Sequence, residues 1–319
     1  MTNWKPTSDS SVATRRAEIL ERARQFFRRQ DVLAVDTPAL GHYATSDPNI
    51  ESLSVRTNSG KASFLQTSPE IYMKRLLAAG YPDIYSVCRV FRDGEAGKRH
   101  QSEFTLAEWY RIGFGLDSII DDTLQFIASC LNKPGLADEA ARYDYAEAFR
   151  KYSAIDVFAA SIDELGNRAT SDARLRAEIG ADRDAALDLI MSTIVAPQFG
   201  HNLLTVVRHY PASQASLARL CPDDNRVADR FEVFCGDVEL ANGYVELTDP
   251  DEQQQRIERD LKTREQSGQS NFPGDEALIA ALHAGLPDCA GVAVGIERLQ
   301  MILDQTDDIK DVVTFVTGP

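Results

Sequence analysis

Residues 230–247 restrict the possible folds of this chain more than any other segment. They contain two apolar runs, 231–235 and 238–247, with Gly236-Asp237 between them. A glycine-containing dipeptide between two such runs is typical of a two-residue β-hairpin. We therefore predict an antiparallel pair of strands in which residue 235 pairs with 238 and residue 234 pairs with 239.

The rest of the chain mixes helix and strand patterns. Helical spacing or helix-start signals mark residues 11–30, 70–79, 118–131 and 250–265, and strand-like runs occupy 32–35, 81–91 and 203–207. Residues 144–196 read as an insertion of helices rich in Ala, Asp and Arg. Because several strand signals are neighbours in the sequence, we expect an α+β fold, an antiparallel β-sheet flanked by helices, and not a doubly wound sheet.

Charge and composition limit the partners and the compartment. The 319 residues include 49 acidic and 34 basic side chains, and the net charge of -15 discourages long contacts with nucleic-acid phosphates. We expect a cytoplasmic protein without membrane contact, because there is no apolar leader and no apolar run of membrane-spanning length. The five cysteines are scattered, without a C-x-x-C pair or clustered histidines, so neither a zinc site nor a disulfide framework is indicated.

Two glutamates of the predicted hairpin favour a cation site. The register places Glu232 and Glu239 diagonally on one face, where they would repel each other unless a cation such as Mg²⁺ lay between them. A solvent-facing polar strand is the equally common alternative. By strict alternation Glu246 faces away from Glu239, so it joins the same pocket only if the strand holds an extra residue. Asn242-Gly243 indicates such a bulge, or a close approach of the backbone to a ligand.

Two arginines are candidates for binding phosphate. Arg92 follows the strand-like run 81–91, and the hairpin that it begins also carries His100 and Phe104, so it can hold a phosphate and a flat base. A solvated hairpin tip is the alternative. Further on, small residues at 291, 293 and 295 leave a flat floor on one strand face, and Arg298 adds charge to the amide donors of a helix start. Alone, these glycines are as often bulges or packing contacts.

In this order, the segments resemble the motifs of class II aminoacyl-tRNA synthetases, and lysyl-tRNA synthetase most closely. The matching residues are Thr67-Ser68-Pro69-Glu70, Arg92, His100, Glu103-Phe104-Thr105, Glu108, Tyr110, Glu239, Asn242-Gly243 and Glu246. The resemblance implies one catalytic domain over residues 1–319, with motif 1 at about 12–40, motif 2 at about 82–111, the helical insertion at about 144–196 and motif 3 at about 287–304. It also implies a homodimer. Since motif 1 begins so early, we expect no anticodon-binding domain.

The chain looks like truncated lysyl-tRNA synthetase paralogues, which attach lysine, preferably (R)-β-lysine, to a lysine of translation elongation factor P. Ala293 strengthens this resemblance, because the tRNA-charging enzymes carry glycine there. The resemblance implies activation of lysine or β-lysine with ATP as an aminoacyl-adenylate, transfer to elongation factor P, and no stable tRNA binding. A ligase with another acceptor, such as a small molecule or a tRNA, and a non-catalytic regulatory paralogue are the alternatives.

Individual residue roles also follow from the resemblance. The implied catalytic residues are Arg92 and Arg298. ATP is expected to contact Arg92, Glu95, His100, Phe104, Glu239 and Arg298. Mg²⁺ is expected on Glu232 and Glu239. The amino-acid pocket is expected to contain Ser68, Glu70, Tyr110, Asn242, Glu246, Ala293 and Gly295. The chain departs from the family in motif 2, where Gly94 stands in the place of a glutamate and Glu95 follows it.

Overall fold

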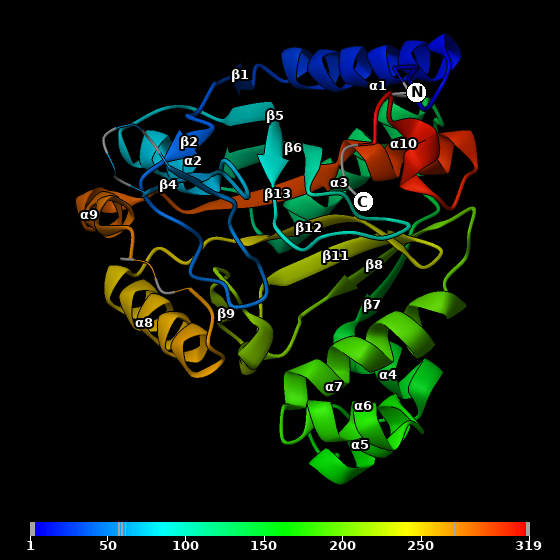
Figure 1. Ribbon diagram of the computed structural model, residues 1–319, viewed down its shortest axis with the longest axis vertical. Coiled ribbons are helices and arrows are strands. Elements are labelled where there is room, and N and C mark those ends of the chain that lie inside the picture. Colours follow the sequence, from blue (N-terminus) through cyan, green and yellow to red (C-terminus); the bar gives the residue numbers. More distant parts are fainter. Residues whose placement is uncertain are drawn as a thin grey trace.

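The computed structural model describes residues 4–56, 58, 60, 62–270, 272 and 274–316. An eight-stranded sheet forms its centre (Figure 1). The strands, in spatial order, are β1 (Leu33–Ala34), β5 (Ile84–Phe91), β6 (Glu103–Ile112), β13 (Cys289–Gly295), β12 (Val238–Val245), β11 (Arg230–Cys235), β8 (Leu204–Arg208) and β7 (Ala141–Asp144). The pairs at the two ends are parallel and the pairs between them are antiparallel. The predicted α+β fold is confirmed, with a mixed and mostly antiparallel sheet.

Three helices cover one face of this sheet: α1 (Ser10–Arg29), α3 (Leu116–Leu131) and α10 (Ile296–Asp304). The aromatic side chains of Phe27, Trp109 and Phe126 pack together in this layer, with ring centroids 4.7–5.2 Å apart. Trp109 is completely buried. Because successive side chains of a strand point to opposite faces, its neighbours Glu108 and Tyr110 point to the other side of the sheet.

Glu297 links the three segments expected as motifs 1, 2 and 3. Its buried carboxylate accepts a hydrogen bond from the backbone N–H of Thr105 on β6 at 2.9 Å. It also accepts one from Arg16 on α1 at 2.8 Å. Burial of a charge is tolerated when it is paired and hydrogen-bonded in this way. The contacts fix α10, and Arg298 with it, against the sheet.

The second face of the sheet is covered in part by α2 (Glu70–Ala78), which packs on Ile84 and Tyr110 through Met73 and Leu77. Beside α2 lie α9 (Glu276–Gly285), α8 (Pro250–Gln266) and a small sheet of β2 (Leu40–Gly41), β4 (Ala62–Leu65) and β3 (Ser54–Arg56) (Figure 1). The remainder of this face carries the candidate site.

The residues expected as a helical insertion form a separate lobe (Figure 1). It contains α4 (Tyr145–Ser153), α5 (Ile162–Ala169), α6 (Ala173–Ile179), α7 (Arg183–Ile190), a π-helix (Met191–Val195) and a 3₁₀-helix (Ala196–Gln198). The lobe has its own apolar core around Tyr145, Phe149 and Leu187.

Short elements complete the described chain. They are the hairpin of β9 (Leu220–Cys221) and β10 (Asp224–Ala228) and two 3₁₀-helices, Ala212–Gln214 and Ile309–Val312. None of the helices in the described ranges combines the length and the apolar character needed to cross a membrane.

Candidate active site

The hairpin of β11 and β12 contains an extra residue that reorganises the face of the sheet. Near the turn the predicted register is confirmed, since Cys235 pairs with Val238 and Phe234 with Glu239. The register then shifts, because Val233 pairs with Ala241, so Leu240 is the inserted residue. Leu240 and Ala241 are therefore both buried. The side chains of Glu239, Asn242, Tyr244 and Glu246 point to the same face of the sheet as Glu232.

The position of this bulge corrects the expectation for Asn242-Gly243. Gly243 stays in continuous register between Phe231 and Val292. A Cβ at this position would lie 2.7 Å from the Val292 side chain and 2.8 Å from the carbonyl oxygen of Gly291. Glycine is thus required at 243 by the neighbouring strand and not by a bulge or a ligand.

Neighbouring strands continue the floor of the site across the sheet. Asn242 pairs with Ala293, and Ala293 pairs with Glu108 on β6. The adjacent row runs from Tyr244 through Gly291 to Tyr110. A Cβ on Gly291 would lie 2.4 Å from the Tyr110 ring and 2.6 Å from Oε1 of Glu246. The absent side chain at 291 therefore leaves the space in which these two groups meet.

An acidic cage lies at one end of this floor, formed by Glu70, Glu108 and Glu246. Lys74, from α2, lies within it: its ammonium nitrogen is 2.7 Å from Glu70 and 2.5 Å from Oε2 of Glu246. Lys74 and Glu246 are each only 2% exposed. Oε1 of Glu246 is buried and has no hydrogen-bond partner among the described residues.

Hydroxyl groups orient the other two carboxylates of the cage. Glu108 accepts hydrogen bonds from Ser68 and from Tyr110, each at 2.8 Å. Tyr244 donates to Glu70 at 2.5 Å. Each carboxylate thus has its own fixed contact, and the cage is arranged before any ligand enters.

The cage contains more negative than positive groups, and the pKa values reflect this. Burial and the neighbouring Glu70 raise the pKa of Glu108 to about 7. Burial also raises the pKa of Glu246, to about 8, although Lys74 lies beside it. Burial disfavours the charged form of Lys74, but Glu246 and Glu70 more than offset this and raise its pKa. One further cation in the cage would stabilise the ionised carboxylates.

At the other end of the floor, Arg92 follows the last residue of β5. Its guanidinium lies over the Phe104 ring, 5.1 Å from the centroid, so it covers one face of that ring. Glu95 reaches the same guanidinium at 3.4 Å. Gly94, with a φ of 74°, makes the turn that brings Glu95 to this position. The carboxylate that contacts Arg92 is thus that of Glu95, the residue after Gly94.

Arg298 lies in the first turn of α10 and meets both the motif 2 hairpin and β12. It donates to the carbonyl oxygen of Glu239 at 2.9 Å, and its guanidinium lies 3.3 Å from that carboxylate. A second guanidinium nitrogen is 2.9 Å from Nε2 of His100. Burial and the charge of Arg298 lower the pKa of His100, which favours a neutral ring.

Glu232 has a different environment from Glu239. It accepts hydrogen bonds from Tyr210 and from Arg230, each at 2.6 Å, and Asn242 lies 3.4 Å away. Burial and the nearby Glu239 raise the pKa of Glu232 to about 7. The two carboxylates therefore repel each other, and Arg230 and Arg298 compensate for part of their charge.

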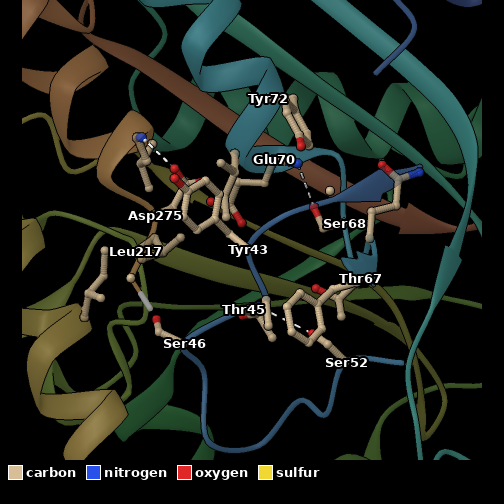
Figure 2. Close-up of a pocket in the computed structure, with 18 of the residues that line it drawn as sticks. Tyr43, Thr45, Ser46, Ser52, Thr67, Ser68, Glu70, Tyr72, Leu217 and Asp275 are labelled. Atoms are coloured by element: carbon tan, nitrogen blue, oxygen red, sulfur yellow. Dashed lines mark hydrogen bonds between the residues drawn. The ribbon is translucent and has the colours of Figure 1, made fainter. Parts of the chain in front are cut away.

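A cavity of about 90 Å³ adjoins the cage on the side of the small sheet (Figure 2). Ser68 and Glu70 line it together with Tyr43 and Tyr72 (Figure 2). Its wall is rich in hydroxyl groups, which are suited to hydrogen bonding with a polar ligand or with water.

Comparison with known proteins places this arrangement in a family. The family model for class II tRNA synthetases (D, K and N) matches residues 4–318 of the sequence. The chain belongs to the class II tRNA synthetases. It is 41% identical over 320 residues to the elongation factor P–(R)-β-lysine ligase of Avibacterium paragallinarum, covering 98% of this chain and 97% of the relative. The ligase of the same name from Photorhabdus laumondii is 42% identical over 324 residues, covering 98% of this chain and 97% of the relative.

Within this class II synthetase the expected site residues gather on one face in two groups. The group at the cage contains Ser68, Glu70, Tyr110, Asn242, Glu246 and Ala293, and the second group contains Arg92, Glu95, His100, Phe104, Glu232, Glu239, Gly295 and Arg298. Gly295 was expected in the amino-acid pocket, but a Cβ added there would lie 3.8 Å from the Arg298 side chain, so this position borders Arg298.

Four residues of the site were not predicted: Lys74, Tyr210, Arg230 and Tyr244. The lysine lies in a charged stretch of a helix, where such side chains are usually solvated. Once the extra residue at Leu240 is taken into account, the alternation of residues 242, 244 and 246 indicates that Tyr244 also faces the site.

Proposed function

We propose that this chain activates (R)-β-lysine or lysine with ATP and transfers the aminoacyl group to a lysine side chain of elongation factor P. The near full-length similarity to ligases of that name supports the proposal. Membership of the class II synthetases supports the use of ATP. The acidic cage supports a substrate with an alkylammonium group.

The excess of carboxylates in the cage is the observation that carries this proposal. Glu70, Glu108 and Glu246 face a single protein ammonium, that of Lys74, and Oε1 of Glu246 lacks a partner among the described residues. A ligand ammonium would supply the missing positive charge. A neutral side chain in its place would leave buried carboxylate unpaired, which explains selectivity for lysine-like molecules.

The proposed reaction has two steps. The carboxylate oxygen of the amino acid attacks the α-phosphorus of ATP, the bond to the β-phosphate oxygen breaks, and pyrophosphate leaves. The acceptor amine then attacks the acyl carbon, loses its proton and displaces AMP. Arg92 would bind the α-phosphate and Arg298 the γ-phosphate, so that charge developing at phosphorus is stabilised by fixed guanidinium groups. Phe104 has one ring face covered by Arg92, and we propose that adenine stacks on the other.

Glu239 and Glu232 fit a magnesium ion by donor type and by charge. Both are carboxylates, the donors that Mg²⁺ prefers, and burial together with the charge of Glu239 raises the pKa of Glu232. Because the oxygens of Glu232 accept bonds from Tyr210 and Arg230, we propose that Glu239 is the main ligand and Glu232 the supporting one. When bound, the ion would neutralise phosphate charge.

The remaining parts of the proposal concern assembly and partners. We propose a homodimer formed through α1 and β1, since β1 is the edge strand of the large sheet and Leu33 is 44% exposed there. We propose no stable tRNA binding, in keeping with the net charge of -15. We also propose the cytoplasm as its location, where a translation factor would meet it.

The decisive experiment measures ATP–pyrophosphate exchange with lysine and with (R)-β-lysine, followed by mass spectrometry of elongation factor P after incubation. Exchange with either amino acid and a mass increase of the factor are expected. Absence of exchange with both would refute the activation step and favour the regulatory paralogue. Exchange without any change in the factor would favour another acceptor, such as a small molecule or a tRNA.

A further inference from the structure

Three side chains that the proposed reaction does not use come together at the ends of neighbouring strands. His209 follows β8, Cys221 ends β9 and Asp229 follows β10. One ligand-type atom from each of these residues lies within 4.8 Å of the other two. All three line a cleft of about 1030 Å³ that also borders the first turns of α3 and α4. An exchangeable ligand could therefore reach them from solvent.

The orientation of His209 is suited to binding a cation. Its Nδ1 lies 3.1 Å from Oδ1 of Asp144. Since an ionised carboxylate only accepts, this contact requires the hydrogen on Nδ1, and in the neutral ring it leaves a lone pair on Nε2. Nε2 faces Oδ1 of Asp229 at 4.0 Å, which is too long for a hydrogen bond. Two acceptors thus face each other across a gap, in the arrangement that carboxylate-oriented histidines have at metal ions.

Asp229 is likewise held in place with one oxygen left available. Its Oδ2 accepts a hydrogen bond from Nε of Arg219 at 2.9 Å, while Oδ1 is the oxygen that faces His209. Backbone hydrogen bonds join the segments that carry the ligands, from Asp229 to Arg219 at 3.0 Å and from Ala228 to Tyr210 at 2.8 Å. The segments that carry the three side chains are therefore held together before any ion binds.

The backbone of His209 provides a further indication. Its φ is 57°, in the left-handed region that is unfavourable for a residue with a Cβ. Such a conformation persists where the surrounding structure imposes it, and it is found preferentially at functional sites.

We propose that His209, Cys221 and Asp229 bind one Zn²⁺ ion, with Asp144 orienting His209 and the fourth coordination position open to the cleft. A nitrogen, a sulfur and a carboxylate oxygen form a donor set typical of zinc. Tetrahedral zinc with bonds of about 2.0–2.3 Å would place these atoms about 3.3–3.6 Å apart, so they need to close by roughly 1 Å. Coordination would release the thiol proton of Cys221 to solvent.

The ion would fasten the β9–β10 hairpin to the end of β8. That hairpin adjoins the amino-acid site, because Ala218, just before β9, forms a β-bridge with Glu246. The site would therefore stabilise the segment that backs the acidic cage, although its existence does not depend on the proposed reaction.

The test uses the full chain, stripped of metal with a chelator and kept in excess Mg²⁺ so that carboxylate sites elsewhere are occupied. Co²⁺ serves as the spectroscopic probe and Zn²⁺ is counted by elemental analysis. We expect one ion per chain and a near-ultraviolet charge-transfer band from thiolate to cobalt. Cys221→Ser should abolish the band, and Asp144→Asn should weaken Zn²⁺ binding by about 10–100-fold.

Two variants keep the result interpretable. Cys88→Ser, at another free and partly buried cysteine, should leave the band unchanged. His209→Asn should abolish stoichiometric binding without added strain, because asparagine tolerates the left-handed backbone, and it decides the matter if Cys221→Ser does not fold. No stoichiometric ion in the unaltered chain, or a band that survives both Cys221→Ser and His209→Asn, would overturn the proposal.

Discussion

The ammonium nitrogen of Lys74 lies 2.5 Å from Oε2 of Glu246, and both side chains are almost completely buried. The pair belongs to the protein itself, yet it lies where a substrate ammonium is expected. Lys74 therefore has two consequences. It makes the burial of several carboxylates tolerable, and it reduces the negative charge that remains for the ligand.

Lys74→Met should destabilise the fold strongly. Removing the ammonium leaves Glu70 and Glu246 without their buried partner, and losing one member of such a pair costs about 3–5 kcal/mol. Denaturant unfolding of the single variant and of Lys74→Met/Glu246→Gln measures this. The double variant should recover part of the loss, since the unpaired charge is gone. Equal stability of the single variant and the unaltered chain would contradict the role given to Lys74.

The affinity for the amino acid should rise with pH. Glu108 and Glu246, with pKa values of about 7 and about 8, carry protons near neutrality, and a bound ammonium favours their ionised forms. Binding should therefore release protons at about pH 7 and tighten toward about pH 8.5. Calorimetry in two buffers with different ionisation enthalpies measures the proton release. Fewer protons should be released in Glu246→Gln. The same number of protons released by both proteins would count against the raised pKa of Glu246.

The same carboxylates should affect the stability of the unliganded chain. Their folded-state pKa values lie above the usual glutamate value of 4.5, so between pH 4.5 and about 8 the folded state binds more protons than the unfolded state. These groups therefore make stability fall as the pH rises through this range. The free energies of unfolding of the unaltered chain and of Glu246→Gln, each measured over this pH range, should converge at its acidic end. Parallel curves at all pH values would disagree with the raised pKa of Glu246.

Gly291→Ala should impair use of the amino acid while leaving nucleotide binding intact. The added Cβ would lie 2.4 Å from the Tyr110 ring and 2.6 Å from Oε1 of Glu246, so one of these groups has to move. We expect kcat/KM for the amino acid in pyrophosphate exchange to fall by about 10²-fold, the size of effect produced by misplacing a reacting group by about 1 Å. Gly115→Ala is the matched control, because a Cβ there meets nothing within 4 Å.

Arg298→Ala should reduce adenylate formation by at least about 10²-fold, because a fixed donor to the phosphates would be lost. Pyrophosphate exchange reports the effect, and circular dichroism checks that the fold is retained. Arg150→Ala in the helical lobe is the control, since that side chain is 65% exposed. A similar loss in both variants would show that the effect is not specific to the phosphate side.

Much of the sheet could be predicted, because hairpins depend on local signals. Gly236-Asp237 was enough to set the pairs 235–238 and 234–239. The bulge was expected at Asn242-Gly243, and its position at Leu240 was missed because a leucine carries no signal for an irregular strand. The small sheet, the β9–β10 hairpin and α9 were also missed, since very short strands show no periodicity and α9 is apolar without a clear polar face.

The candidate site was only partly predictable, for a physical reason. Residues such as Arg92 and Glu239 follow from motif spacing, but buried pairs depend on contacts between segments far apart in the chain. Lys74 and Glu246 are an example, and so are His209, Cys221 and Asp229, whose spacing matches no simple metal motif. Their proximity is produced by the packing of α2 on β5 and β6 and by the β9–β10 hairpin.

The single inserted residue at Leu240 makes the length of this strand as important as its composition. A substitution between residues 240 and 246 changes one side chain at a time. Deleting one residue would instead move every later side chain, up to Glu246, to the opposite face of the sheet. The number of residues in this segment is therefore expected to be constrained as strictly as Gly243 and Glu246 themselves.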